Sequence, residues 1–208
     1  MKKLILAAAI VLSMAKGFSQ TETGTTGSLT WILTLSDSTL TISGNDTMPN
    51  YADGTYVPWY SFNGEIKTVI IDDGVTSIGN YAFGYYSGYN NLISVTIPNS
   101  VKTIGEYAFY GSTGLTFLII PENVTSIGRG AFSFCHNIQT IDYNAIDCVM
   151  DNSIASMFAD CDAFTLNIGN QVKSIPDNAF RRCTGLTSLI IPDNVTTIGD
   201  NAFLGVRL

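Results

Sequence analysis

The sequence predicts a β-rich solenoid, in which short strands and tight turns stack into about six rungs. Two observations indicate this fold class: a motif with fixed positions recurs along the chain, and a short apolar segment precedes each copy. The composition agrees, because Thr, Ser, Asn, Gly and Ile are abundant and favour strands and turns over long helices. The 208-residue chain is 46% hydrophobic and 13% charged, so it must bury its apolar residues efficiently or associate.

The repeated motif is Val-x-x-Ile-x-x-x-Ala-Phe. Its regular copies end at Phe83, Phe109, Phe132, Phe180 and Phe203. Gly follows the Ile in every regular copy except one, where Pro176 replaces it. The long interval between Phe132 and Phe180 contains one further, degenerate copy at residues 138–163, in which Phe158 takes the place of the anchor.

The apolar segment upstream of each Val is expected to form a strand. These segments are Val69–Ile71, Val95–Ile97, Leu118–Ile120, Leu166–Ile168 and Leu189–Ile191. Proline follows three of them and ends the strand there, because it cannot donate a hydrogen bond to a ladder. One unit cannot bury its own apolar face, whereas stacked units bury a continuous core. The Gly-x-x-Ala-Phe segment is expected to form one tight helical or 3-10 turn.

The full pattern, Leu-x-x-Leu-x-Ile-Pro-x-x-Val-x-x-Ile-Gly-x-x-Ala-Phe, resembles the BspA-type leucine-rich repeat of bacterial surface proteins. Leu115–Phe132 and Leu186–Phe203 match it almost throughout, and the resemblance covers residues 66–206. It implies a leucine-rich repeat solenoid that binds a protein, such as a host matrix or cell-surface protein. We therefore expect a solenoid over residues 66–208, secreted or at the surface of a bacterium.

The first 19 residues have the features of a signal peptide. Lys2 and Lys3 precede an apolar run from Leu4 to Ala15, and Gly17-Phe18-Ser19 supplies small residues for cleavage. The alternative is an uncleaved anchor, although the run is short for a membrane span. No Cys follows the run, which argues against a lipoprotein anchor. Residues 20–28 are interpreted as a linker.

Residues 29–65 lack the repeat and are expected to form an N-terminal β cap. Leu29–Leu35 and Thr39–Ser43 alternate like strands on either side of a predicted turn, which indicates a hairpin. Trp31 and Trp59 are expected to pack in this cap, and stacking on a sugar is the alternative. At the other end, Leu204–Leu208 are too few to cover the last rung and no recognisable anchor follows. Either the gene product is a short form, or the open apolar end pairs with another molecule, as in self-association.

The four cysteines favour packing over chemistry. Cys135, Cys161 and Cys183 each follow an anchor Phe by three residues, which indicates a buried ladder position. A disulfide between Cys161 and Cys183, or between Cys135 and Cys161, is the alternative. The single histidine, His136, and the absence of Cys-x-x-Cys spacing argue against a metal site. No catalytic motif or nucleotide-binding loop is present, so we expect no enzymatic activity and no cofactor.

The outward positions of the strands form the predicted binding face. Alternation along each strand sends every second side chain away from the core. The resulting candidate residues are Thr68, Ile70, Ser94, Thr96, Phe117, Ile119, Thr140, Asp142, Thr165, Asn167, Ser188 and Ile190. Phe117 and Ile119 are neighbouring apolar residues on this face, and they suit either a partner contact or an ordinary solvent-exposed position.

Two further features bear on partners. The degenerate copy is acidic, with Asp142, Asp147, Asp151, Asp160 and Asp162, and is either a specificity loop or a drifted repeat. The formal net charge of −7 argues against nucleic acid and anionic membranes. The favoured function is non-catalytic protein binding or adhesion. The alternatives are carbohydrate binding, for which Trp31, Trp59, Tyr85 and Tyr86 are candidates, and a self-associating envelope component.

Overall fold

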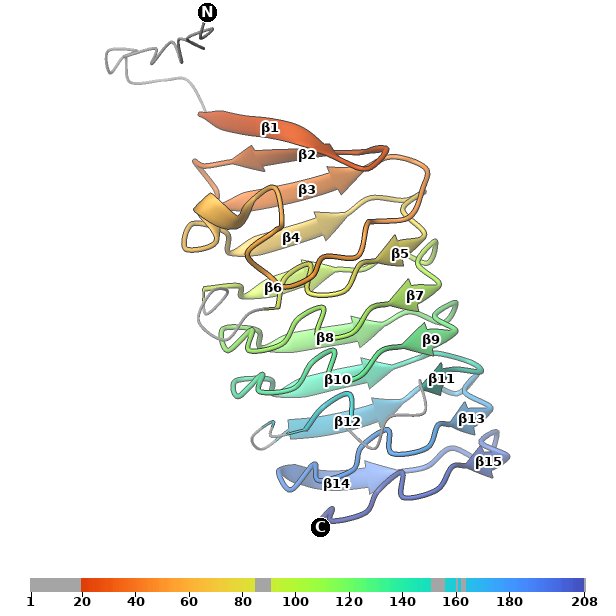
Figure 1. The fold of residues 1–208 in the computed structure, drawn as a ribbon. Helices are drawn as coiled ribbons and strands as arrows, with labels where there is room; N and C mark the ends of the chain where they lie inside the picture. Colours follow the sequence, from red (N-terminus) through yellow and green to blue (C-terminus); the bar gives the residue numbers. More distant parts are fainter. Residues whose placement is uncertain (1–19, 85–90, 151–155, 160, 162–163, 208) are drawn as a thin grey trace, which may run out of the picture.

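The computed structural model describes residues 20–84, 91–150, 156–159, 161 and 164–207, which form a solenoid of stacked rungs (Figure 1). Each rung contributes a strand of three to five residues to one face and a strand of two residues to another. The sole helix in the described residues is the 3-10 turn η1 (Tyr60–Phe62), and no helix there has the length and apolar character that a membrane crossing requires. The predicted signal peptide, residues 1–19, lies outside the described residues.

The longer strands form the sheet face, which is the outward side of β4, β6, β8, β10, β12 and β14. Their bounds are β4 (Thr68–Ile71), β6 (Ser94–Thr96), β8 (Phe117–Ile120), β10 (Thr140–Tyr143), β12 (Phe164–Ile168) and β14 (Leu186–Ile190). Neighbouring strands run parallel and in register, so that Thr140 lies between Phe117 and Thr165. The face is interrupted twice: β6 and β8 belong to separate hydrogen-bonded sheets, and the register between β12 and β14 shifts at Phe164 and Leu166.

The two-residue strands form a second, narrower face. They are β5 (Ser77–Ile78), β7 (Thr103–Ile104), β9 (Ser126–Ile127), β11 (Val149–Met150), β13 (Ser174–Ile175) and β15 (Thr197–Ile198). β5, β7, β9 and β11 form one ladder and β13 pairs with β15, so the ladder is interrupted after β11. This break lies in the degenerate copy, beside a depression of about 330 Å³ that Cys148, Val149 and Pro176 help to line.

The Gly-x-x-Ala-Phe segments form a third side, the turn face, and they are not helical. In the second rung the Ala108 N–H donates to the Gly105 carbonyl, which closes a single turn. Tyr107 then takes a left-handed conformation, with φ of 52°, and this prevents a helix from continuing. The Phe109 N–H donates instead to the Ala131 carbonyl of the next rung at 2.8 Å. The expected helical turn is therefore replaced by turns that are hydrogen-bonded from rung to rung.

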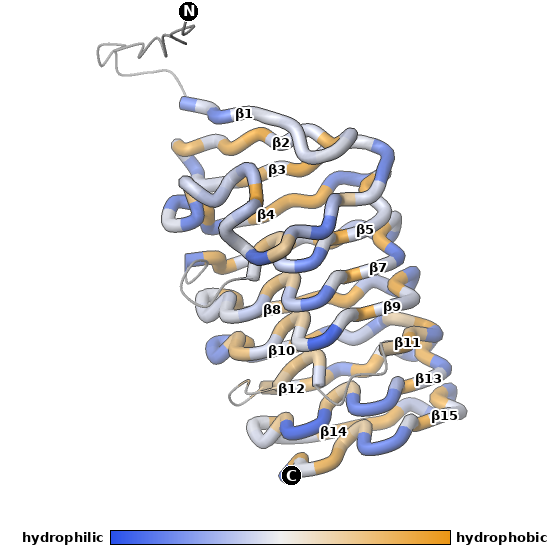
Figure 2. Tube along the Cα trace, viewed as in Figure 1, coloured by the Kyte–Doolittle hydropathy of each residue, from blue (hydrophilic) through white to orange (hydrophobic). Residues whose placement is uncertain are grey.

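The core between the three faces is a set of parallel ladders, and apolar residues recur at the same place in successive rungs (Figure 2). The inward Leu, Val and Ile residues of the middle rungs are almost completely buried. The anchor Phe rings stack in a column that begins at Trp59 and ends at Phe203, with neighbouring centroids 5.2–5.5 Å apart. Glycine is needed beside this column, because a Cβ on Gly105 would lie 2.5 Å from the Asn80 nitrogen.

The N-terminal cap contains β1 (Thr21–Thr26), β2 (Leu29–Thr34) and β3 (Thr39–Ser43). β2 and β3 form the predicted antiparallel hairpin, and β3 continues into the solenoid by pairing in parallel with β4. Residues 20–28, interpreted as a linker, instead contain β1, which pairs along its whole length with β2. The physical reason is the free edge of β2, whose backbone groups accept a further strand even though that strand has few apolar residues.

Candidate binding surface

The structure places the predicted sheet-face residues in two columns along the solenoid. Register pairs align Thr68 with Ser94 and Ile70 with Thr96, and β8, β10 and β12 continue the pattern. The most exposed members include Phe117 at 44%, Ile119 at 45% and Ile190 at 81%. Ser94, Thr96, Asn167 and Ser188 are also exposed, and the half-buried members are Thr68, Ile70, Thr140, Asp142 and Thr165.

Phe117 and Ile119 lie side by side on β8, in the middle of the sheet face. Ile119 also lines a shallow depression of about 260 Å³, whose other walls include Pro121, Glu122 and Asn144. An apolar pair beside a depression with polar walls is an arrangement suited to holding a side chain of a partner. On the neighbouring strand the Asp142 carboxylate accepts a hydrogen bond from the Asn167 amide at 2.8 Å, which fixes both side chains.

The lower part of the sheet face is less regular. The irregularity between β12 and β14 leaves Ser188 without a register partner, although Asn167 still lies opposite Ile190. Asn167, Ser188 and Ile190 line a depression of about 220 Å³. Regular alternation therefore describes the face as far as Asn167 on β12, and the extra residue in β14 shifts Ser188 out of register.

The two tryptophans pack inside the cap. Trp59 is fully buried and its indole nitrogen donates to the Ala82 carbonyl at 3.2 Å. Trp31 is 6% exposed and lies over Gly24, where a side chain would leave no room for the indole ring. Neither ring offers a face to a sugar in this structure, so the predicted cap packing describes them. The other carbohydrate candidates, Tyr85 and Tyr86, lie outside the described residues.

The cysteine column has a structural role. Cys135, Cys161 and Cys183 are buried and are not joined in disulfides, and each thiol donates to the carbonyl of an anchor Phe, at 3.3–3.5 Å. Ser112 makes the same contact with the Phe83 carbonyl. Burial raises the pKa of Cys135 well above its ordinary value, which argues against a reactive thiolate. Four successive rungs therefore have a small donor side chain at this position, whereas the last rung has Val206.

The degenerate copy still forms a rung of the solenoid, but it differs from the regular rungs in several side chains. Phe158 stays in the ring column, and Tyr143 occupies the inward position that is Ile in other rungs. Burial raises the pKa of the nearby Cys148 thiol to about 11. Of its acidic residues, Asp142 lies on the sheet face and Asp147 hydrogen-bonds Ser174, whereas Asp151, Asp160 and Asp162 lie outside the described residues. No group of three metal-ligating side chains occurs in the described part of the chain.

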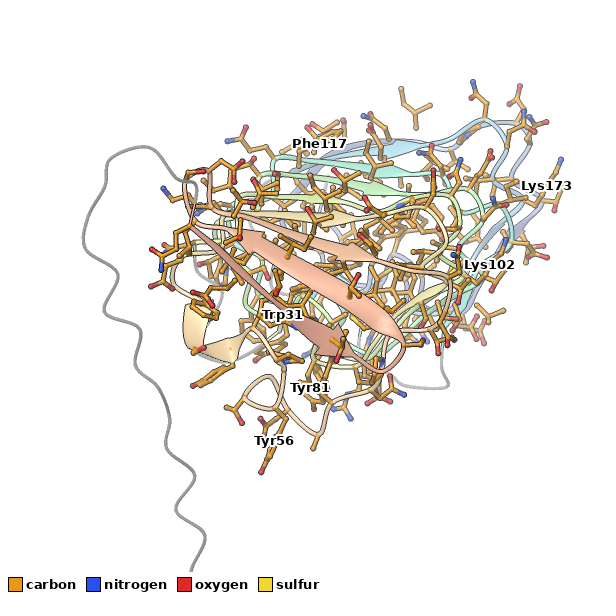
Figure 3. The ribbon with its side chains drawn as sticks, turned by 90° about the horizontal axis from the view of Figure 1, so that it is seen from above. Trp31, Tyr56, Tyr81, Lys102, Phe117 and Lys173 are labelled. Atoms are coloured by element: carbon orange, nitrogen blue, oxygen red, sulfur yellow. The ribbon has the colours of Figure 1, made fainter. Side chains whose placement is uncertain are left out.

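The sequence-based search overlooked the aromatic residues of the turn face. Tyr81, Tyr107, Tyr110 and Phe134 contact one another in sequence along the solenoid axis, and His136 contacts Phe134. Figure 3 shows Tyr81 on the side of the solenoid opposite Phe117. A signal for this feature existed, because Tyr81 and Tyr107 occupy the same repeat position, two residues before the anchor Phe.

Comparison with known proteins gives a match to one family model and likenesses to several solved structures. The family model described as "BspA type Leucine rich repeat region" matches residues 55–154 and 152–208 in six copies. A leucine-rich repeat protein of T. pallidum has 20% identity and a TM-score of 0.53, with 86% of each chain covered. A leucine-rich repeat protein of Eubacterium ventriosum has 19% identity and a TM-score of 0.34, with 91% of this chain and 96% of that one covered. A leucine-rich cell-surface protein of Faecalibacterium prausnitzii has 20% identity and a TM-score of 0.39, covering 92% and 87%. None of the curated proteins matches this chain.

Proposed function

Because the chain belongs to the BspA-type leucine-rich repeat family, we propose that it is a non-catalytic, secreted or surface-exposed protein that binds a protein partner through its sheet face. The single observation that carries this proposal is the exposed pair Phe117 and Ile119. Two apolar side chains, each close to half exposed, lie next to each other in the middle of a face that is otherwise mostly Thr, Ser and Asn.

The surroundings of the pair support a contact with protein. Interface centres are depleted in charge and enriched in aromatic side chains, with a polar rim around them. Phe117 supplies the aromatic group, and the rim consists of Ser94, Thr96, Thr140 and Asp142 on the two neighbouring strands. The face is extended and built on rigid strands, so an elongated partner would meet it without large rearrangement.

Surface plasmon resonance of the purified chain tests the proposal. The probes are a panel of purified host extracellular-matrix glycoproteins, each in native and enzymatically deglycosylated form. We expect at least one to bind equally well in both forms, and the Phe117→Asp/Ile119→Asp variant to bind it at least about tenfold more weakly.

Ile32→Asp is the matched control. Ile32 is 46% exposed and points outward from β2, several strands away from β8. The Ile32→Asp variant should bind the matrix glycoprotein as the parent chain does. Binding that survives the double substitution in a folded protein contradicts the sheet-face proposal, and binding that disappears on deglycosylation favours a carbohydrate ligand instead.

A further inference from the structure

The turn face has an aromatic stripe, made of Tyr81, Tyr107, Tyr110 and Phe134. Neighbouring ring centroids are 5.1 Å apart between Tyr81 and Tyr107, 5.5 Å between Tyr107 and Tyr110, and 5.1 Å between Tyr110 and Phe134. The three tyrosines are partly exposed, and Phe134 is 38% exposed. The stripe therefore runs without a break across the first three regular rungs, parallel to the solenoid axis.

The backbone conformation at two positions of the stripe does not favour aromatic residues. Each regular rung has a left-handed residue two positions before its anchor Phe, and the later rungs place Gly130, Asn178 and Asn201 there. Glycine and asparagine suit this conformation, whereas a bulky aromatic residue is strained in it. The first two rungs nevertheless carry Tyr81 and Tyr107, with φ of 57° and 52°.

A second left-handed position repeats the pattern. Two residues after the anchor Phe, the structure has Gly111 and Gly205, but Phe134 with φ of 62° in the third regular rung and Arg182 in the fourth. Three strained aromatic residues thus occur together in one stripe, although Asn or Gly serves most of the equivalent turns elsewhere in the chain. Backbone strain that clusters in this way points to a binding function.

Arg129 brings a positive charge to the stripe, and Glu106, at the same repeat position one rung earlier, brings a negative one. Its guanidinium carbon lies 5.7 Å from the centroid of Tyr107, and the side chain is exposed. The other three arginines, Arg181, Arg182 and Arg207, follow the anchor Phe residues of the last two regular rungs, where Asp177 and Asp200 occupy the repeat position of Arg129. Within the described residues no carboxylate forms an ion pair with Arg129, so a carboxylate from outside would complete it.

Ring geometry decides between classes of ligand. A sugar stacks on an open aromatic face, but Tyr107 has Tyr81 against one side, at an interplanar angle of 28°, and is also covered by Arg129. Tyr107 at the centre of the stripe therefore presents its edge and hydroxyl group, together with the guanidinium group of Arg129. Tyrosine and arginine are the residue types enriched in the energetically dominant positions of protein interfaces.

We propose that the aromatic stripe is a second docking surface, distinct from the sheet face, for an extended polypeptide segment in which an acidic side chain neighbours an aromatic or aliphatic one. The carboxylate pairs with Arg129, and the apolar side chains pack on the edges of Tyr107, Tyr110 and Phe134. The stripe has the direction of the solenoid axis, so the segment lies across the rungs and not along one strand.

Fluorescence anisotropy with three synthetic peptides tests this proposal. The first alternates Glu and Phe, the second Glu and Ser, and the third Lys and Phe, each labelled at one end. We expect the Glu-Phe peptide to bind the full chain at least about tenfold more tightly than either control. Tyr107→Asn and Arg129→Gln should each weaken its binding by about tenfold, while Phe117→Asp/Ile119→Asp leaves it unchanged.

Thermal unfolding separates this role from a structural one. Tyr107→Asn should leave Tm unchanged or raise it, because Asn suits the left-handed conformation. The matched control, Asn178→Tyr, should lower Tm by about 2–4 °C and leave peptide binding as it is. The proposal is overturned if no peptide binds, if both controls bind equally, or if the exposed Arg129→Gln variant binds like the parent. It is also overturned if the stripe variants abolish binding to an oligosaccharide array but not to peptide.

Discussion

The two ends of the described solenoid meet solvent in different ways. At the start, β1 lies over the ladder with Glu22, Gly24 and Thr26 on its inner side, and Trp31 fills the space that Gly24 leaves. In the last rung, Ile198 is 48% exposed, whereas Ile175, the same position one rung earlier, is 1% exposed. The residue type is identical, so the difference in burial comes from the neighbouring rung. The burial of an inward residue therefore depends on the rung that follows it as well as on its own rung.

The largest expected effect is at the covered end. Trp59→Ala removes a fully buried indole that begins the ring column and donates to the Ala82 carbonyl. We expect the free energy of unfolding to fall by about 3–5 kcal/mol. Phe203→Ala, at the other end of the same column, should cost about 1–2 kcal/mol because Phe203 is only partly buried. Urea denaturation of both variants measures the contrast, and equal losses would show that the ends do not differ.

A second substitution tests how closely the cap is packed on the first rung. A Cβ on Gly79 would lie 1.8 Å from the Pro49 carbonyl oxygen, whereas nothing lies within 4 Å of one on Gly64. Gly79→Ala should therefore cost about 2–3 kcal/mol, since backbone must move. Gly64→Ala should change stability by less than about 0.5 kcal/mol. A tolerated Gly79→Ala would mean that the cap moves away at little cost.

The cysteine column allows a kinetic comparison between the middle of the array and its last rungs. Cys135 lies inside the array, and Cys183 lies in the rung next to the exposed last one. Alkylation needs both local opening and a thiolate, and opening is easier near a poorly covered end. We expect iodoacetamide to modify Cys183 at least about tenfold faster than Cys135 at mildly alkaline pH, as measured by peptide mass spectrometry. Burial raises the pKa of Cys148 to about 11, so the rate at which iodoacetamide modifies Cys148 should increase with pH up to that value. Simultaneous modification would show that all rungs open together.

The smallest effect on stability is expected at Ile198. Ile198→Thr should change the free energy of unfolding by less than about 0.5 kcal/mol, while Ile104→Thr, at a buried equivalent position, should cost about 2–3 kcal/mol.

We also expect the 208-residue chain to associate at high concentration through Ile190, Ile191, Ile198 and Leu204, which are exposed together in the last rung. Light scattering of Ile190→Asp/Ile198→Thr should show less association. A parent chain that stays monomeric contradicts this.

Repetition explains how much of the fold could be predicted. Each inward Val, Ile and Phe recurs at a fixed position, so the rungs, their faces and the outward pair on β8 could be derived from alternation. β1 was missed because Thr-Glu-Thr-Gly-Thr-Thr lacks an apolar pattern and acquires its strand from the edge of β2. The extra residue in β14 could not be predicted either, because the spacing of apolar residues in the sequence does not indicate it.

The turn face shows a different limit. Gly130, Asn178 and Asn201 at one repeat position indicate a left-handed residue, but Tyr81 and Tyr107 conceal that preference. A pattern search also looks for positions that stay the same, whereas the aromatic stripe consists of positions where the copies differ. The thiol-to-carbonyl bonds of the cysteine column were likewise visible only once the rungs were stacked.

The column of stacked rings has a mechanical consequence. The anchor rings are held by the rungs above and below, with centroids 5.2–5.5 Å apart. Tension applied along the axis would detach the last rung before the others, since each inner rung has two neighbours. Phe109 and Phe132 are 23 residues apart, so every released rung would lengthen the chain by about 75–80 Å. A molecule tethered between two surfaces would therefore unfold one rung at a time under tension, and each unfolding step would absorb mechanical work.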